Sequence, residues 1–445
     1  MAKLVYDKEG RLLFTKEMAA EYTVLVPQML PIHFEFITKA LSLGGLNVEV
    51  LNTTHRGIID AGLKHVHNDI CFPALLVIGQ MIDALKSGKY DVHKVALMIT
   101  QTGGGCRASN YIHLLRKGLI KAGYDFVPVI SLNLSGLESN PGFHMSLPMI
   151  SRLICGVVYG DALMWLSNHS RAYELNVGET DALVKKWTTK ISDEMKHTRL
   201  PNRKKVRENL LGIAKDFGNI KMGGEPKPRV GVVGEIYVKF APLGNNNLER
   251  FLRSEGAEVV VPGLMDFLIF KVDNRVEDSI IYGGKAAKKA VAKILRDYII
   301  GYQNLLRECL SAADGYPVPA RYGDIKEMVR GFLGYGNKMG EGWLLTAEML
   351  ELIHSGVNNI VCTQPFGCLP NHIVGKGMMR PVREANPTAN IVAIDYDPGT
   401  TSVNQENRLK LMLANARKAL ERQQAGEHPS TERQPEQTER ETVAR

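Results

Sequence analysis

The 445-residue sequence contains no uninterrupted apolar run as long as the roughly 18 residues that a membrane-spanning helix requires. Its first residues, MAKLVYDKEG, lack the apolar segment of a secretory signal peptide. The sequence also contains no G-x4-G-K-[ST] loop, which excludes that class of nucleotide site. We therefore expect a cytoplasmic protein that does not contact a membrane, in a compartment where disulfides are rare.

Charge is only mildly unbalanced, with 55 basic and 47 acidic residues and a formal net charge of +8. This net charge is compatible with an anionic partner but does not identify one. The densest basic run, residues 196–207 (KHTRLPNRKKVR), has no interleaved aromatic side chains. It therefore argues against nucleic-acid binding and favours a solvated helix face.

The pattern of the first third predicts an α/β unit over residues 1–148. Short runs rich in β-branched and aromatic residues alternate there with helical patterns, which is typical of a parallel sheet covered by helices. The expected strands are residues 22–27, 48–51, 95–100 and 126–132, and the expected helices are 32–43, 73–86 and 110–122.

Residues 149–228 read as a helical connector that ends in a Gly- and Pro-rich linker, 221–229. A second α/β alternation then occupies residues 229–421. Its expected strands are 230–236, 258–262, 359–363 and 391–395, and its expected helices are 248–255, 285–307 and 342–354. Residues 422–445 contain almost no apolar side chains, so a disordered tail is expected. The predicted fold class is α/β, with two parallel-sheet domains and a helical connector.

Four of the six cysteines lie in loops. Cys106 follows three glycines, Gly103, Gly104 and Gly105, directly after a predicted strand and before a helix. Ligands bind in such connections in open α/β sheets, and glycines let the backbone approach them and aim N–H groups at them. An anion-binding turn with an incidental thiol is the alternative.

The remaining cysteines differ in setting. Cys71 begins a predicted helix, and it could adjoin Cys106 or be a small buried hydrophobe. Cys368 lies in a turn formed by Pro365 and Gly367, whereas Cys362 ends a strand and could equally belong to its core. Cys155 and Cys309 have apolar, helical surroundings, which predicts packing.

Three or four thiolates from two α/β halves could bind several kinds of metal centre. Structural zinc sites usually show C-x2–4-C pairs, which this sequence lacks. Iron–sulfur clusters accept widely spaced cysteines from separate loops. The residues therefore favour an iron–sulfur cluster, and they leave zinc or no metal as alternatives.

The same loops carry a resemblance to a known family. The sequence resembles the 2-hydroxyacyl-CoA dehydratase-like superfamily, in particular the dehydratase-like portion of the large CoA-substrate-specific activases. The resemblance extends over residues 13–413, nearly the whole predicted folded chain. Its longest motifs include HNDICFPALLVIGQ, TQTGGGCRASN, GVVGEIYVKFAPLGNNNLE, GEGWLLTAEM and CTQPFGCLPNHIVGKGM.

The resemblance implies two flavodoxin-like domains with a cluster in the cleft between them. In this superfamily three cysteines hold a [4Fe-4S] cluster, and by motif they correspond to Cys71, Cys106 and Cys368. Cys362 is an additional thiol and a further candidate ligand. A related branch holds a double cubane. Gly103, Gly104, Gly105 and Asn371 are the expected cofactor contacts, and the other polar candidates are Gln101, Thr102, Ser135 and His372.

The function that the resemblance implies is reductive dehydration of a 2-hydroxyacyl-CoA, with electrons from a separate ATP-hydrolysing activator that has its own cluster. The alternatives are a double-cubane-type reductase of small molecules, an electron-transfer accessory subunit, or a nucleotide-binding protein without redox chemistry. Both a homodimer and a heterodimer are compatible with the sequence. No general acid or base is identified by the sequence.

Overall fold

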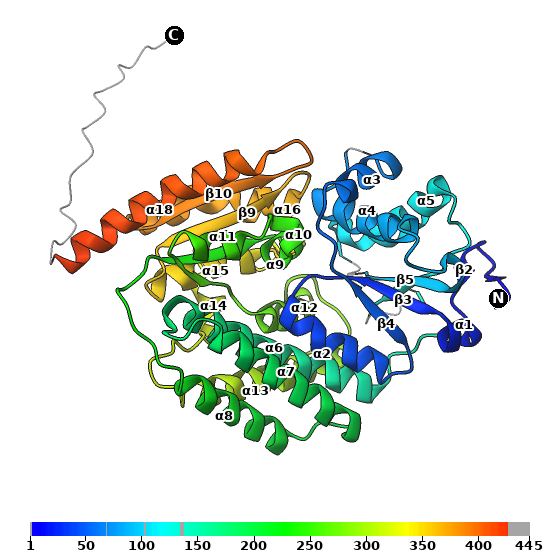
Figure 1. Cartoon of the computed structure of the whole chain (residues 1–445), viewed down its shortest axis with the longest axis horizontal. Coiled ribbons are helices and arrows are strands. Elements are labelled where there is room, and N and C mark those ends of the chain that lie inside the picture. The colour runs from blue at the N-terminus through cyan, green and yellow to red at the C-terminus, as the bar shows by residue number, and fades with distance from the viewer. Residues whose placement is uncertain (1, 68, 102–103, 134–137, 426–445) are drawn as a thin grey trace, which may run out of the picture.

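The computed structural model describes residues 2–67, 69–101, 104–133 and 138–425, and shows a mixed α/β protein with two four-stranded parallel sheets among many helices (Figure 1). The first sheet consists of β3 (Thr23–Pro27), β4 (Asn47–Leu51), β5 (Val95–Thr100) and β6 (Val129–Leu132). The second consists of β7 (Arg229–Gly234), β8 (Glu258–Val260), β9 (Asn359–Pro365) and β10 (Asn390–Tyr396). The predicted α/β class with two parallel sheets is confirmed.

Both sheets have the same strand order. The orders are β4-β3-β5-β6 and β8-β7-β9-β10, so in each sheet the first strand lies between the second and the third. The chain thus changes direction between β3 and β5, and again between β7 and β9. In open α/β sheets ligands bind outside the carboxyl ends of the strands at such a switch point. A binding site is therefore expected in the segments that follow β5, β7 and β9.

The first sheet is flanked by α2 (Pro31–Ser42), α3 (Gly57–His65), α4 (Phe72–Lys86) and α5 (Tyr111–Ala122). Nearly every residue of α4 is buried. Helices α3 and α4 cross closely, because a Cβ atom on Gly79 would lie 2.2 Å from the carbonyl oxygen of Ile58. The chain begins with a two-stranded hairpin, β1 (Val5–Tyr6) and β2 (Leu12–Leu13), followed by α1 (Lys16–Glu21).

A layer of long helices lies along both sheets (Figure 1). Its members are α6 (Leu147–Tyr173), α7 (Glu179–His197), α8 (Arg203–Gly218), α12 (Leu264–Ile281) and α13 (Ala286–Leu310). The last two come from the stretch assigned to the second α/β unit, but they pack against α6, and α13 also packs against α8. Helix α2 of the first sheet packs on α6 and α7. The helical region therefore draws on two separate parts of the sequence.

Helix α6 is long and apolar enough to cross a membrane by length and composition. Most of its apolar stretch is buried inside the protein, which is also usual for the core helix of a globular fold. Arg152 and Asp161 interrupt its sequence, so no continuous apolar run marks it.

The two faces of the second sheet are covered by different helices. Alternate residues of its strands pack with α15 (Trp343–His354), α16 (Leu369–Val374) and α17 (Met379–Ala385) on one face. The other face packs with α11 (Leu248–Ser254) and α18 (Ser402–Gln424). Short helices α9 (Ile236–Phe240), α10 (Pro242–Asn245) and α14 (Tyr322–Met328) complete this half. Helix α18 continues three residues into the predicted tail, and residues 426–445 lie outside the described chain.

Candidate functional site

Three cysteines each stand directly before a helical segment. Cys71 is the N-cap residue of α4, Cys368 is that of α16, and Cys106 precedes the 3-10 turn Arg107–Asn110 that leads into α5. No side chain in capping hydrogen-bond geometry occupies these starts. First-turn N–H groups still act on the thiols, because they counteract the rise in pKa of all three cysteines. A thiolate or its metal complex would be favoured at these positions.

The Cys71 and Cys368 loops touch through their backbones, although they belong to different sheets. The Phe72 N–H donates to the Phe366 carbonyl oxygen at 2.9 Å. Gly367 has a φ of +70°, and a Cβ atom there would lie 3.0 Å from Cys71 Cα. A residue with a side chain would therefore push the two loops apart.

Two contacts bring the Cys106 loop to the same place. The Gly105 N–H lies 3.1 Å from the sulfur of Met339, which precedes α15 of the second half. The Arg107 guanidinium donates to the carbonyl oxygen of Asp69, close to Cys71 in the sequence. The structure thus places the Cys71, Cys106 and Cys368 loops beside one another; the residue pattern had suggested adjoining loops for Cys71 and Cys106.

Cys71 is buried, Cys106 and Cys368 are partly buried, and Cys71 interacts electrostatically with both of the other thiols. Burial raises the pKa of Cys71 to about 11, and Cys106 contributes to the rise. Burial also raises the pKa of Cys106, and that of Cys368, to which Cys71 contributes. Cys71 Sγ lies 3.0 Å from the hydroxyl oxygen of Tyr111, whose pKa is raised well above its usual value, mainly by burial. Without a metal these thiols are neutral, and coordination would deprotonate them.

Two buried glutamates face the same group. Glu235 directly follows β7 and accepts a hydrogen bond from the Val238 N–H at 2.9 Å. Glu341, before α15, accepts one from the Ile236 N–H at 3.0 Å. Burial, and next the neighbouring Glu341, raise the pKa of Glu235 to about 8. Both carboxylates also contribute to the raised pKa values of Cys106 and Cys368.

Neither Glu235 nor Glu341 was predicted from the sequence. A usable signal existed for Glu235, which stands at the carboxyl end of the buried strand VGVVG, where α/β proteins place ligand groups. Glu341 lies between two glycines in GEGW and carries no local signal of this kind.

Lys271 of α12 adds a cation to this region. Its ammonium group donates to the carbonyl oxygen of Gly340 and lies 4.8 Å from the ring centre of Phe267. Burial lowers the pKa of Lys271, while Glu341 and Cys106 oppose that shift.

Cys362 occupies a different environment from the three cysteines above. It is fully buried in β9, on the face covered by α15, α16 and α17, and burial raises its pKa to about 12. Its sulfur lies 3.7 Å from the amide oxygen of Asn371. Among the described residues, the hydrogen bonds and core contacts of Cys362 are with Asn371 and the interior of this face, and none joins it to Cys71, Cys106 or Cys368.

Asn371 lies beside Cys368, but its side chain is engaged within the second half of the protein. Its amide nitrogen donates to the Thr363 carbonyl oxygen at 2.8 Å, and its amide oxygen faces Cys362, so the buried side chain braces α16 against β9. Its backbone N–H is the part that acts on Cys368.

The remaining residues singled out from the sequence lie in different environments. Gly104 and Gly105 are exposed beside Cys106, and His372 is exposed on α16. Gln101 is engaged within its own sheet, where it accepts from the Ser131 hydroxyl at 2.8 Å. Thr102, Gly103 and Ser135 lie outside the described residues. Cys155 and Cys309 are buried in α6 and α13 within the main core, as predicted.

The cysteine group can be compared with the donor arrangements that metal centres require. Across residues 2–67, 69–101, 104–133 and 138–425, no three His, Cys, Asp or Glu side chains are placed to hold one metal ion. A zinc site needs its donors within about 2.0–2.3 Å of one point. A four-iron cluster takes one thiolate at each iron, so its ligands come from separate loops. Cys71, Cys106 and Cys368 likewise come from three separate loops, each before a helical segment.

Comparison with known proteins adds no family to these observations. No protein-family model matches the chain, and no curated protein matches it.

Proposed function

We propose that Cys71, Cys106 and Cys368 hold an iron–sulfur cluster, and that the protein uses it for low-potential reductive chemistry. The observation that carries the proposal is that three helical segments that each follow a cysteine begin side by side: a backbone hydrogen bond of 2.9 Å joins the Cys71 and Cys368 loops from the two sheets, and Gly105 and Arg107 connect the Cys106 loop to Met339 and Asp69. Three protein thiolates would leave one iron of a [4Fe-4S] cluster open to a substrate. The resemblance to 2-hydroxyacyl-CoA dehydratases supports the same donor set.

The reaction we propose is dehydration of a 2-hydroxyacyl-CoA. A bound cluster would supply single electrons and a Lewis-acidic iron. Glu235 would supply a proton, because a carboxyl group whose pKa is raised to about 8 is mostly protonated at neutral pH. A departing hydroxyl group needs such a proton to leave as water. Lys271, half-buried beside Gly340, would balance negative charge at the site.

The partner we propose is an ATP-hydrolysing activator, which would bind over the cysteine loops. Met339, Phe366, Leu369 and Ile373 surround these loops and are between 42% and 67% exposed. Phe366 and Leu369 flank Cys368 in the sequence, and Met339 contacts Gly105 beside Cys106. Exposed apolar groups gathered around a redox centre favour docking of an electron donor there.

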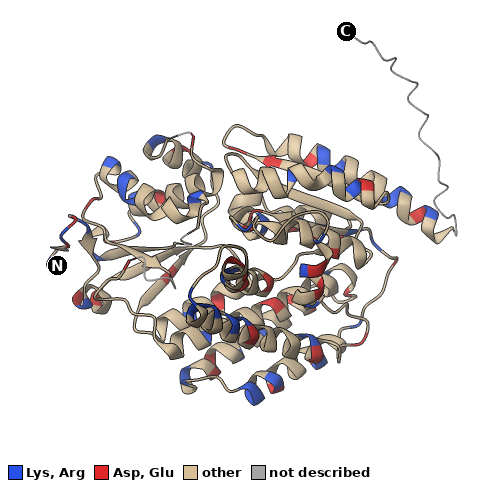
Figure 2. Ribbon diagram, turned by 180° about the vertical axis from the view of Figure 1, so that it is seen from behind, with Lys and Arg blue, Asp and Glu red and all other residues tan. Residues whose placement is uncertain are grey.

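The basic run 196–207 is a poorer docking surface than its composition suggests. Lys196 pairs with Asp193, Lys205 with Glu194, and Arg207 with Glu308. Acidic and basic residues accordingly alternate along the helices there (Figure 2). The run lies between α7 and α8 at the lower edge of Figure 1, whereas α4 and α16, which begin at the site, lie in its upper half.

The experiment compares iron and acid-labile sulfide in anaerobically purified wild-type protein with those in Cys71→Ala, Cys106→Ala and Cys368→Ala. We expect about four irons per chain in the wild type and a severe loss in each variant. Cys309→Ala is the matched control and should keep its iron, since that thiol is packed in the main core. Wild-type iron in the Cys106 variant would refute the proposed ligand set.

A second assay tests the reaction. The reduced protein is incubated with 2-hydroxyacyl-CoA thioesters, ATP and a candidate activator, and enoyl-CoA is measured. We expect product only when activator and ATP are both present. A loaded cluster without turnover on any thioester would instead support an electron-transfer or small-molecule reductase role.

A further inference from the structure

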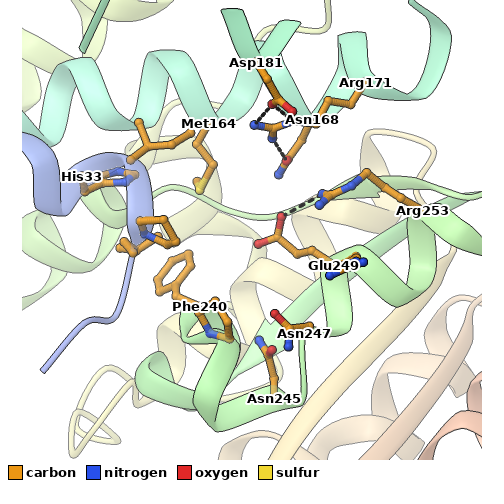
Figure 3. Close-up of a pocket in the computed structure, with 15 residues that line it drawn as sticks. His33, Met164, Asn168, Arg171, Asp181, Phe240, Asn245, Asn247, Glu249 and Arg253 are labelled. Atoms are coloured by element: carbon orange, nitrogen blue, oxygen red, sulfur yellow. Dashed lines mark hydrogen bonds and ion pairs between the residues drawn. The ribbon is translucent and has the colours of Figure 1, made fainter. Parts of the chain in front are cut away.

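A pocket separate from the cysteine group lies where the start of α2, helix α6 and the 240–253 segment meet (Figure 3). Its volume is about 250 Å³. One side is apolar, formed by Leu30, Met164 and Phe240, and the opposite side carries arginines and asparagines. Such a division suits a ligand with an apolar body and a polar head.

The polar side retains one unpaired positive charge. Arg171 is held by Asp181, with 2.9 Å between Nε and Oδ1, and Arg253 lies 3.4 Å from Glu249. Arg250 is exposed at the pocket and forms no ion pair with any residue in the described ranges. A charged guanidinium without a partner is a strong donor for a carboxylate or phosphate.

A buried amide in the pocket also lacks an acceptor. Asn168 is 3% exposed, and its amide oxygen accepts from Arg171 at 3.4 Å. Its amide nitrogen has no hydrogen-bond partner in the part of the chain that the structure describes. Figure 3 shows this amide below Arg171, pointing into the pocket. Leaving such a donor unsatisfied costs about 1–3 kcal/mol, so an acceptor from a ligand would be favoured there.

The third donor set is the start of α2. Its N-cap residue is Leu30, which has no side-chain acceptor, and Pro31 follows it. Pro31, Ile32 and His33 line the pocket, so the free N–H groups of the first turn lie at its wall. Free first-turn N–H groups of a twelve-residue helix favour an anion.

We propose that this pocket binds an organic anion, with a carboxylate or phosphate head at Arg250 and Asn168 on its polar side. Its apolar body would lie against Met164 and Phe240. The proposal does not rest on the iron–sulfur function. Helix α9 connects the two sites, with Glu235 at its start and Phe240, which lines the pocket, at its end.

The test measures binding to the full chain by isothermal titration calorimetry with hexyl phosphate, hexanoate and hexanol, and with coenzyme A. The three hexyl compounds share a body and differ in head group. We expect at least one of the two anions to bind about tenfold or more tightly than hexanol, and binding to weaken as salt rises. The better anion identifies the head group, and coenzyme A tests a larger phosphate-bearing ligand.

Two variants locate the site. Arg250→Ala should weaken binding of the better anion about tenfold or more, and Asn168→Asp should do the same by placing a negative charge in the pocket. Arg380→Ala, an exposed arginine of α17 paired with Glu384, is the matched control and should bind normally. Absence of anion binding, equal binding of hexanol, or unchanged affinity in Arg250→Ala would each overturn the proposal, whatever the iron content of the protein.

Discussion

Replacing Gly367 by alanine tests the backbone contact on which the cysteine site depends. Gly367 combines a positive φ of +70° with a close approach to the Cys71 loop. Gly88→Ala is a matched control, because Gly88 has a φ of +73° and no atom lies within 4 Å of the position that a methyl group would take there. The two substitutions share the cost of placing alanine in left-handed backbone, and only Gly367→Ala adds a steric conflict.

The structure gives the size of each effect. A left-handed conformation costs a non-glycine residue about 1–2 kcal/mol. A methyl group at Gly367 would lie 3.0 Å from Cys71 Cα and 3.3 Å from both the Cys71 nitrogen and the Ile70 carbonyl oxygen. All three neighbours are backbone atoms, so rotation of a side chain cannot relieve the contact. Overpacking of this kind costs about 1–3 kcal/mol more.

The assay is urea unfolding together with iron incorporation under anaerobic conditions. We expect Gly88→Ala to lose about 1–2 kcal/mol and to keep its iron. Gly367→Ala should lose about 2–5 kcal/mol and bind less iron, because the Cys71 and Cys368 loops separate. If both variants showed the same stability and full iron content, the close approach of these loops would not matter for the site.

Three further outcomes follow from burial and charge. Cys362→Ala should retain wild-type iron content, because its thiol lies in the core of the second sheet, and clear iron loss would restore it as a ligand. Burial raises the pKa of Glu235 to about 8, so the metal-free folded protein keeps a proton that the unfolded chain releases from about pH 4.3 upward. That contribution to stability is complete below this pH and is lost as pH rises toward 8. Glu235→Gln should therefore flatten the fall of the unfolding free energy with pH, by at most about 1.4 kcal/mol per pH unit. The control Glu225→Gln, at an exposed position, should leave that slope unchanged. Ending the chain after Gln424, the last residue of α18, should leave the melting temperature unchanged, and a lower value would show that residues beyond it dock on the fold.

The strands were the most predictable part of the fold. Strand β5 has the predicted bounds, and β3 and β10 differ from prediction by a residue at one or both ends. Buried parallel strands are continuous runs of β-branched and aliphatic residues, so the sequence marks them clearly. The packing of the helices was less predictable. Helix α13 was expected where it occurs, but helical periodicity does not tell which layer a helix joins.

The helical segment before Cys71 shows a second limit of prediction from the sequence. The start of α4 was predicted correctly, but α3 was not, so Cys71 stands between two helices and not directly after a strand. Helix α3 crosses α4 closely, and Gly79 allows the two helices to approach. A single glycine within an apolar helix gives no sign of the helix that will cross there.

Cys362 and Glu235 show why the site could be predicted only in part. Strand β9 is buried on both faces, so no alternation of polar and apolar residues indicates which way Cys362 points. Turn residues did mark Cys106 and Cys368, because glycine and proline restrict the backbone locally. The shifted pKa of Glu235 arises from burial and from Glu341, more than 100 residues away. Tertiary structure creates that property, and no local pattern contains it.

The protonation state of the site connects these observations. The thiols of Cys71, Cys106 and Cys368 and the carboxyl group of Glu235 all have raised pKa values, so near neutral pH the metal-free site holds its protons. Lys271 alone would not balance three thiolates together with Glu235 and Glu341. A metal cluster would replace the thiol protons, since thiolates are its ligands and binding releases their protons. The positive charge of a [4Fe-4S] core is smaller than the negative charge of three thiolates, so the loaded site would carry net negative charge, and more of it after reduction. That charge would favour retention of the Glu235 proton. Protonation of Glu235 would thus be coupled to reduction of the cluster, which is the relation that an acid beside a redox centre requires.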